Sequence, residues 1–481
     1  MPGMCDDSDV QEIEVDATPI ERMTRLLDSE RGAQLREVAD RARVLLSGRT
    51  VWNINATATG GGVAEMLQSL LAYGRGAGVD TRWLALDGTP DFFHLTKRLH
   101  NRLHGTAGDG GPLDERQRPG YEAALAPNLA QLLTRVRPGD IVLLHDPQTA
   151  GLAGGLRRSG AHVVWRCHVG RDTPNEQTDT AWSFLRPYVE QAQDLVFSRR
   201  AYAPPWVDAR HLWVIPPSLD PFSPKNRDLT EAEVGAALRQ AGLVELPGAA
   251  GDLGFRRRDG STGTVRRHAG LLSGGAPVPG GARVVLQVSR WDRLKDMAGV
   301  LRAFTMTRLP EDVHLMLVGP DTSGVSDDPE GAAVLEDCRS VWRAQPVQER
   351  RRLHLCSLPM DDVDENAHLV NALQRHATVV VQKSLVEGFG LTVTEPMWKA
   401  RAVVASRVGG IKDQIVHGDS GLLLDDPTDL STFGSLVLSV LTTPGLSRRL
   451  GASARERVRE QYLGDRHLTQ YVGLFERLLS K

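Results

Sequence analysis

The residues of this sequence that are suited to chemistry lie in short polar segments, each directly after an apolar run typical of a buried strand. One such segment is Ser289–Asp296, which carries Arg290 and Lys295 and follows the apolar run 283–288. Two cations in one loop can neutralise a diphosphate without a metal ion. The alternative is a pair of surface side chains that only face water, but the position at a strand end favours a binding role.

Glu387 and Glu395 lie eight positions apart around a glycine-containing turn, Gly388-Phe389-Gly390. If a helix begins near Leu391, Glu395 lies one turn inside it and Glu387 precedes it. A carboxylate accepts two sugar hydroxyls at once, and the backbone amides of residues 388–391 can bind an oxyanion or a hydroxyl at the helix N-terminus. Two solvated glutamates would not need these glycines, so the pattern favours a ligand site.

Three further polar segments follow other apolar runs. Gly60-Gly61-Gly62 stands between a strand pattern and an amphipathic helix pattern, where glycines let the backbone approach a ligand. Taken alone, a merely tight turn explains these glycines equally well. The segments containing His145 with Asp146 and Arg166 with His168 follow two more runs. A single histidine is more often structural than catalytic, but here two polar clusters share one predicted sheet edge.

Apolar runs alternate with helical patterns along the chain, which predicts an α/β protein with parallel sheets covered by helices on both faces. The runs form two series, and each is typical of a doubly wound, Rossmann-like domain. The expected strands are residues 51–54, 79–86, 140–145, 162–167, 194–198 and 212–215 in the first series, and 283–288, 313–318, 353–356, 378–381 and 402–406 in the second.

The domain boundaries follow from breaks in this rhythm. Residues 1–48 are expected to be an appended N-terminal extension, residues 49–218 the first domain and residues 219–463 the second, with Pro216-Pro217 at the junction. The last helical pattern, 464–481, can pack on either domain. Residues 247–281 are rich in Gly and Arg with little periodicity, which predicts an exposed, mobile insertion.

Composition excludes several classes of protein. The 481 residues carry a formal net charge of −3, so no global field favours nucleic acid or anionic lipid. No apolar run is long enough for membrane insertion, and the N-terminus lacks a signal-peptide pattern, so a cytoplasmic enzyme is expected. The four cysteines show no CxxC pairing, and Asp361-Asp362 and Asp425-Asp426 lack further ligands, so no metal site is expected.

Together these residues resemble the retaining glycosyltransferases built from two facing Rossmann-like domains with a cleft between them (the GT-B type), which include sucrose and glycogen synthases. The resemblance rests on Gly60–Gly62, Arg290 with Lys295, and the pair Glu387 and Glu395, and covers the chain from about Thr50 onward. A closer similarity, to the trehalose glycosyltransferring synthases and somewhat less to trehalose phosphorylases, rests on the following segments: Trp52–Asn55, Gly60–Leu67, Phe92-Phe93, Thr96-Lys97, His145–Gln148, Trp165–His168 and Ile215–Pro221.

The resemblance implies a role for each matching residue. In the second, donor domain, Glu395 would hold the donor ribose, and Arg290 and Lys295 would hold the leaving diphosphate. The transferred sugar would be held by Glu387 and by the amides of Gly388, Phe389, Gly390 and Leu391. In the first, acceptor domain, Gly61 and Gly62 would close on the phosphates, with His168 beside the reacting sugar and Asp146 nearby. Residues 358–362 would lie near the base. Attack on one face, with the phosphate taking the acceptor's proton, requires no metal or other cofactor.

The implied activity is transfer of a hexose, glucose above all, from a nucleotide-diphosphate sugar to a sugar acceptor, with glucose giving trehalose. A trehalose phosphorylase using a sugar 1-phosphate, another acceptor, a sugar-nucleotide epimerase and a non-catalytic sensor are the alternatives. The E-x7-E spacing of Glu387 and Glu395 disfavours the epimerase. The sequence does not determine the nucleobase of the donor (UDP, ADP, GDP or TDP), whether the enzyme forms a homodimer, or the role of residues 1–48 and 247–281.

Overall fold

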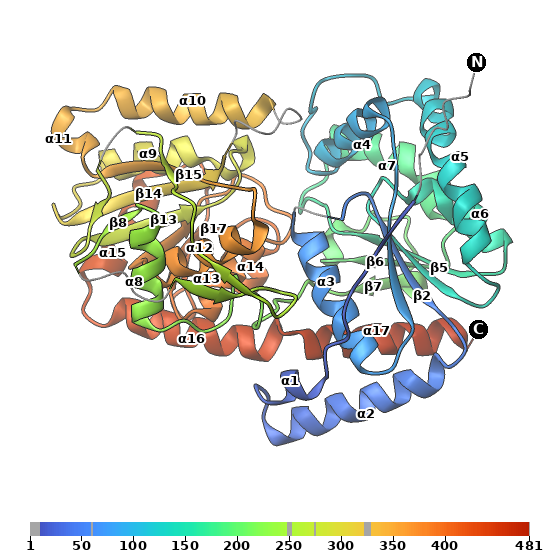
Figure 1. Cartoon of the computed structure of the whole chain (residues 1–481). Helices are drawn as coiled ribbons and strands as arrows, with labels where there is room; N and C mark the ends of the chain where they lie inside the picture. Colours follow the sequence, from blue (N-terminus) through green and yellow to red (C-terminus); the bar gives the residue numbers. More distant parts are fainter. Residues whose placement is uncertain (1–9, 59–60, 248–252, 274–275, 322–328, 481) are drawn as a thin grey trace, which may run out of the picture. The chain divides into compact units, whose positions relative to one another are not determined.

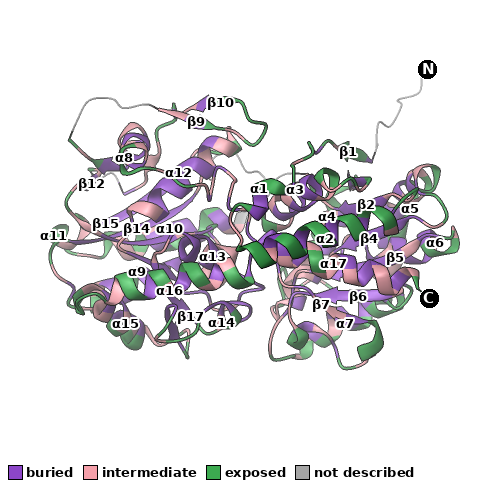
Figure 2. Ribbon diagram, turned by 90° about the horizontal axis from the view of Figure 1, so that it is seen from below, coloured by how far each residue is buried: buried purple, intermediate pink, exposed green. Residues whose placement is uncertain are grey.

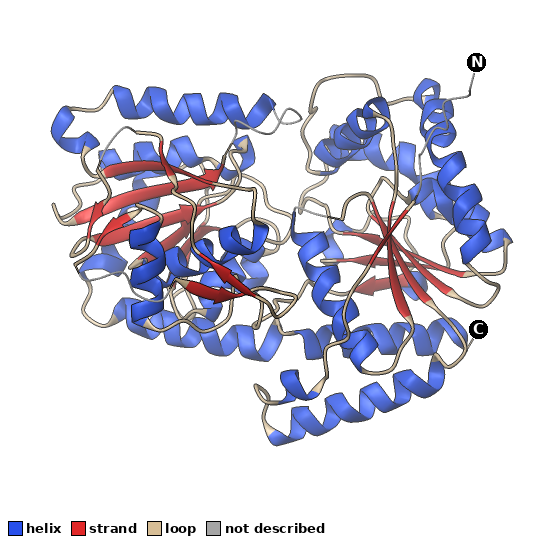
Figure 3. Ribbon diagram, in the orientation of Figure 1, coloured by secondary structure: helices blue, strands red, loops and turns tan. Residues whose placement is uncertain are grey.

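The computed structural model describes residues 10–58, 61–247, 253–273, 276–321 and 329–480 and divides the chain into two units (Figure 1). Unit 1 comprises Met1–Ser218 together with Tyr462–Lys481, and unit 2 comprises Leu219–Gln461. Each unit has a mostly parallel sheet between layers of helices, so the predicted fold class of two doubly wound α/β domains is confirmed (Figure 3). The cleft between the domains stays a prediction.

The described residues of unit 1 form a seven-stranded sheet in the order β1-β3-β2-β4-β5-β6-β7. All neighbouring strands are parallel except β1, which pairs with β3 in antiparallel fashion and joins part of the predicted N-terminal extension to the sheet. The strands are β1 (Gln11–Ile13), β2 (Val51–Asn55), β3 (Thr81–Ala85), β4 (Ile141–His145), β5 (His162–Cys167), β6 (Asp194–Phe197) and β7 (Leu212–Val214).

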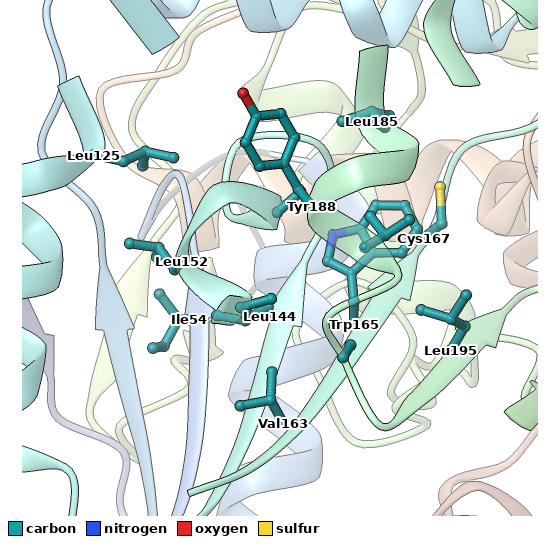
Figure 4. Packing of buried hydrophobic residues seen from close by; sticks show 14 of the residues in the cluster. Ile54, Leu125, Leu144, Leu152, Val163, Trp165, Cys167, Leu185, Tyr188 and Leu195 are labelled. Atoms are coloured by element: carbon teal, nitrogen blue, oxygen red, sulfur yellow. The ribbon is translucent and has the colours of Figure 1, made fainter. Parts of the chain in front are cut away.

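Helices cover both faces of this sheet because its buried strands alternate apolar side chains between the two faces. Val163, Trp165 and Cys167 of β5 belong to a cluster with α4–α7 (Figure 4), whereas Val164 packs in a cluster with Leu474 of the C-terminal helix α17. The helices of unit 1 are α1 (Glu21–Thr24), α2 (Ser29–Leu45), α3 (Gly61–Gly76), α4 (Pro90–Leu103), α5 (Arg118–Arg135), α6 (Ala153–Arg158), α7 (Glu176–Val189) and α17 (Gly464–Leu479).

Unit 2 contains a second seven-stranded sheet among its described residues, in the order β11-β15-β14-β13-β16-β17-β18. Only the edge strand β11 is antiparallel to its neighbour. The strands of the sheet are β11 (Gly270–Leu271), β13 (Arg283–Val288), β14 (Val313–Pro320), β15 (Leu353–Leu358), β16 (Val379–Gln382), β17 (Ala402–Ser406) and β18 (Leu422–Leu424).

The central strands of unit 2 are buried from both sides (Figure 2). One face packs on α9, α10, α15 and α16, and the other on α8 and α12. The helices are α8 (Glu231–Gln240), α9 (Met297–Met306), α10 (Pro329–Arg343), α11 (Val347–Arg350), α12 (Val363–His376), α13 (Leu391–Trp398), α14 (Ile411–Gln414), α15 (Leu430–Thr442) and α16 (Leu446–Gln461).

The segment 247–281, predicted to be an exposed, mobile insertion, contains short strands in its described part; residues 248–252 and 274–275 lie outside the described residues. The segment forms β9 (Gly254–Arg256), β10 (Thr262–Thr264), β11, and β12 (Val278–Pro279), which pairs with β8 (Val244–Glu245). Phe255 is 2% exposed and stacks on His368 of α12. Arg257 pairs with Asp362. The buried apolar side chains of this segment are too far apart in sequence to show a period, so the sequence pattern does not predict these strands.

No single described helix has the length and apolarity to cross a membrane, although the bent pair α15 and α16 passes that test when its two helices are taken together.

Candidate active site

The polar segment after β13 and the polar segment after β16 meet at the middle of the unit 2 sheet. From β13 the chain continues to β14 and β15 on one side, and from β16 to β17 and β18 on the other. Ligands bind at such a switch in strand order, beyond the carboxyl ends of the strands. The switch therefore brings Ser289–Asp296 and Lys383–Gly390 to one place, as their positions at strand ends predicted.

Lys295 and Glu387 form an ion pair at this switch point. Lys295 Nζ donates to Glu387 Oε2 at 2.6 Å, and both side chains are largely buried, with 14% and 10% exposed. Ser384 Oγ donates to the same carboxylate oxygen at 3.1 Å. Because three groups from two loops converge here, Glu387 has a fixed position at the sheet edge rather than a solvated one.

A buried lysine anchors the loop that carries Lys295. Lys383, whose side chain is 0% exposed, pairs with Asp296, and Asp296 also caps α9 by accepting a hydrogen bond from the backbone of Gly299. Arg290 lies differently from Lys295, since its side chain is 58% exposed and pairs with Asp292 in its own loop at 3.3 Å. Arg290 can therefore turn toward a ligand at little cost, whereas Lys295 would have to leave Glu387 or share it.

The turn between Glu387 and α13 depends on two glycines. Gly390 has φ of +86° and precedes the first residue of α13, and a Cβ at this position would lie 3.1 Å from Glu387 Cγ. A Cβ on Gly410 would lie 2.6 Å from Phe389 Cα. Among the described residues no side chain caps α13, and the buried hydroxyl of Thr392 in its first turn has no hydrogen-bond partner. The first turn of α13 is therefore open to an oxygen-rich ligand.

Glu395 lies inside α13, where the sequence pattern placed it, and is 5% exposed. Its Oε2 accepts a hydrogen bond from Gln374 Nε2 at 3.2 Å, and its Oε1 lies 3.6 Å from Lys225 Nζ. Lys399 lies alongside and donates to Gln374 at 2.7 Å; its burial lowers the pKa of its ammonium group. Gln374 and Lys225 could not be predicted from the sequence, since both come from segments distant from Glu395.

Unit 1 has a corresponding switch in strand order between β2 and β4. Gly61 and Gly62 begin α3 after β2, while Gly60 lies outside the described residues. Asp146 and His168 follow β4 and β5, and they are in contact, because Asp146 Oδ1 accepts a hydrogen bond from the backbone amide of His168 at 2.7 Å. Asp146 has φ of 64°, a left-handed conformation that is uncommon outside glycine.

Buried surroundings shift the titration of these groups in opposite senses. Burial raises the pKa of Asp146 to about 7, although the amide of His168 and the charge of Arg166 act against it. Burial and the same arginine charge hold the pKa of His168 well below 6.5 and bring that of His145 to about 3. The two histidines are therefore neutral at pH 7. His145 Nδ1 lies 3.1 Å from His168 Nε2.

The residues expected near a nucleobase lie at the end of β15. Asp362 caps α12, and Asp361 pairs with Arg267 at 2.6 Å. Within the described ranges, no group of three or more His, Cys, Asp or Glu side chains is arranged to hold a metal ion.

Comparison with known families identifies the kind of enzyme to which the chain belongs. The family description "Trehalose synthase, N-terminal domain" matches residues 53–204, and "Glycosyl transferases group 1" matches residues 363–457. The chain belongs to the trehalose synthase family of GT-B glycosyltransferases, and it is an enzyme with hexosyltransferase activity.

Relatives match nearly the whole chain. A trehalose synthase from Rubrobacter xylanophilus is 35% identical over 93% of this chain and 94% of its own length. A trehalose synthase from Pyrococcus horikoshii is 31% identical over 98% of this chain and 99% of its own. The solved structure of an α,α-trehalose 6-phosphate synthase from Burkholderia multivorans shares the fold, with a TM-score of 0.63 at 16% identity over 90% of this chain and 99% of that one.

Proposed function

We propose that this enzyme transfers a glucosyl group from a nucleoside diphosphate glucose to glucose, with retention, and so forms trehalose. The observation that carries the donor half of the proposal is the pair of Lys295 and Glu387 at the switch point beside the open first turn of α13. The acceptor half is supported by the relatives, which are named trehalose synthases and which this chain matches over almost their whole length.

In the proposed reaction the bond between the anomeric carbon and the diphosphate oxygen breaks, and a hydroxyl oxygen of the acceptor bonds to the same face of that carbon. The acceptor's proton passes to the leaving phosphate, so no carboxylate pair has to flank the anomeric carbon, unlike in glycoside hydrolases. Lys295 and Arg290 stabilise the charge that grows on the diphosphate. Glu387 holds the transferred sugar, and Glu395 the ribose.

In unit 1, His168 is proposed to lie beside the reacting sugar, with Asp146 behind it. Support comes from the geometry of Asp146, whose carboxyl group binds the backbone amide of His168 and has a pKa raised to about 7. A carboxyl group of this kind can hold the segment in place while carrying only part of a full negative charge at neutral pH. Gly61 and Gly62 leave the start of α3 free of side chains, so backbone amides can approach a phosphate.

The test is a panel of UDP-, ADP-, GDP- and TDP-glucose with glucose or glucose 6-phosphate as the acceptor, and NMR of the product linkage. We expect an α,α-1,1 linked disaccharide with glucose as acceptor, and full activity in EDTA. A disaccharide with an inverted anomeric centre, or activity lost in EDTA and restored by Mg²⁺, would overturn the mechanism.

A second arm of the panel tests the phosphorylase alternative. Trehalose and inorganic phosphate are supplied without nucleotide, and glucose 1-phosphate is measured. The proposal expects none above the background of a Glu387→Gln variant. Release of glucose 1-phosphate at a rate comparable to nucleotide-dependent synthesis would identify a phosphorylase instead.

A further inference from the structure

Arg166 is a fully buried arginine at the end of β5, and it faces away from the cluster that its neighbours join. Trp165 and Cys167 point into the cluster with α4–α7, as Figure 4 shows, so alternation along the strand turns Arg166 to the opposite face. On that face lies α17, the last helix of the chain. Arg166 is 0% exposed, and no described carboxylate lies within ion-pair distance of it.

The guanidinium of Arg166 is held instead by neutral acceptors from distant segments. Its Nη1 donates to His467 Nε2 at 3.1 Å and also contacts the hydroxyl of Tyr471, and both residues belong to α17. Its Nη2 donates to the backbone oxygen of Ile215 at 3.1 Å. A buried charge without partners would cost roughly several kcal/mol, so these contacts are needed to stabilise the guanidinium, and together they fix its plane.

The remaining donor of Arg166 points at the candidate active site. Arg166 Nε lies 3.4 Å from His168 Nδ1. An arginine can only donate, so Nδ1 is the acceptor and the single ring proton of neutral His168 is on Nε2. That proton points to His145 Nδ1 at 3.1 Å, and His145 Nε2 in turn lies 3.1 Å from the acceptor oxygen of Asn53. In this series of hydrogen bonds, each residue donates to the next one, starting from Arg166.

We propose that Arg166 is a positioning residue that fixes His168 in its Nε2–H form, and that α17 sets this position through His467 and Tyr471. This inference rests on the proposed role of His168 beside the reacting sugar. When the substrate binds, the Nε2–H group of His168 would donate to a sugar hydroxyl instead of to His145 Nδ1. A helix encoded after the whole of unit 2 thus takes part in the acceptor half-site without touching the substrate.

Tyr471→Phe and Arg166→Lys are the test variants, and Tyr188→Phe is the control. Tyr471→Phe removes only the hydroxyl that contacts Arg166. Tyr471 and Asn53 both line an apolar cavity of about 90 Å³ in unit 1. Tyr188 belongs to the same unit, and its hydroxyl donates to Glu122 outside this hydrogen-bond chain. Lysine keeps the charge of Arg166 but has no donor at the position of Nε.

The first measurement is the ¹⁵N spectrum of the histidine rings, with His168 assigned from a His168→Gln variant. We expect wild-type protein and Tyr188→Phe to show Nδ1 of His168 unprotonated, and Arg166→Lys to show a mixture of the two forms. The second measurement is kinetic: kcat is expected to fall about 10²-fold in Arg166→Lys, as for misplacement of a reacting group by about 1 Å, and several-fold in Tyr471→Phe. Nucleotide affinity is expected to stay within about twofold in both.

The pH profile gives a third readout with Arg166→Gln, which removes the charge. The charged and titratable groups facing His168 are Arg166, His145, His467 and Asp146. Because the Arg166 charge disfavours protonated His168, its loss is expected to raise the pKa of His168 and to move the acid-side loss of kcat/KM to higher pH. A purely structural role would lower the melting temperature without moving this limb.

An unchanged His168 form in Arg166→Lys, or a kcat within twofold of wild type in a folded variant, would overturn the proposal. If Arg166→Lys does not fold, the ring spectrum and kcat of Tyr471→Phe decide alone: the proposal then fails when both match Tyr188→Phe. Failure of the proposed function would be a separate result. If wild-type protein transfers glucose from no nucleotide donor, the ring spectrum still tests the position of the His168 proton independently.

Discussion

At the scale of single residues, Glu387 and Glu395 differ in their surroundings and should fail differently. Glu387 is paired with Lys295 at the switch point, beside the position proposed for the transferred sugar, where positive charge grows as the bond to phosphate breaks. We expect Glu387→Gln mainly to lower kcat, by about 10²-fold or more. Glu395→Gln, assigned to ribose, should mainly raise KM for the donor. Steady-state kinetics on both variants measures the difference.

The matched control for this pair is Glu311→Gln, which changes an exposed glutamate of the same unit and is expected to alter neither parameter by more than about twofold. A lowered kcat in Glu395→Gln together with a raised KM in Glu387→Gln would mean that the two roles are exchanged.

The two cations of the Ser289–Asp296 loop should also be separable. Charge-assisted contacts are worth about 1.5–3 kcal/mol each, so replacing either Lys295 or Arg290 by Ala is expected to lower kcat/KM by about 10²-fold. Lys295→Ala also leaves Glu387 without its cation in a largely buried place, so it should lower the melting temperature as well. Arg290, 58% exposed, should not. Arg293→Ala, an exposed cation of the same loop, is the control, and an effect equal to that of Arg290→Ala would contradict a specific role.

Asp146 gives a pH dependence whose sign follows from its raised pKa. Its ordinary value is 3.8, and the folded value is about 7. Between these values the native state binds a proton that the unfolded state has lost, so this group's contribution to the free energy of unfolding falls as pH rises. Asp146→Asn lacks the titration but keeps an acceptor for the amide of His168.

Urea unfolding of both proteins at several pH values checks this expectation. The free energy of unfolding of wild type minus that of Asp146→Asn is expected to decrease from about pH 4 to about pH 7 and then to level off. A difference that does not change with pH would show that Asp146 is ionised at neutral pH.

Residue types and spacing indicated the charged groups of the candidate site but not the groups that hold them. Lys295 and Glu387 could be identified because each follows a strand. Lys383, Gln374 and Lys225 could not, because they are ordinary residues until the fold brings them beside Asp296 and Glu395. The outward series of hydrogen bonds from Arg166 was invisible for the same reason, since His467 lies 301 positions away.

At the scale of elements, the turn into α13 makes the position of Glu387 depend on Gly390. Its φ of +86° strains any other residue, and a Cβ there would lie 3.1 Å from both Glu387 Cγ and Ile411 Cγ1. Gly390→Ala is therefore expected to lower kcat/KM at least tenfold, since the carboxylate must move. Kinetics and thermal unfolding measure the two effects.

Gly418→Ala is the matched control, because Gly418 has a similar φ of +81° but nothing within 4 Å of an added Cβ. It should lose about 1–3 kcal/mol from backbone strain alone and keep kcat/KM within about twofold. If both variants lost the same activity, strain rather than contact with Glu387 would be the cause.

The long central strands were predictable because buried parallel strands are continuous apolar runs. The edge strands β1 and β11 were not, since β1 has three residues and β11 two, and each pairs in antiparallel fashion with a strand distant in sequence. The hairpin β9–β10 is held on α12 by ion pairs of Arg257 and Arg258 with Asp362 and Asp364, and no local period in the sequence shows such pairs.

At the scale of the whole molecule, unit 2 is one continuous segment with its own buried clusters on both sheet faces. The residues assigned to the donor lie in it, apart from Gly61 and Gly62. We expect Leu219–Gln461, expressed alone, to fold and to bind the donor nucleotide within about tenfold of the full chain, with no transfer activity. Calorimetry measures the affinity, and Lys295→Ala in the isolated segment should weaken it. No binding by a folded segment would place the donor site elsewhere.

Unit 1 differs from unit 2 in that its last helix, α17, is encoded after the whole of unit 2. On a ribosome adding about 5–20 residues per second, Arg166 emerges tens of seconds before His467 and Tyr471 exist. During that interval its guanidinium lacks the α17 partners that hold it in the finished protein, so water has to solvate it instead. The unit that leaves the exit tunnel first is thus completed last, after unit 2 has had time to fold.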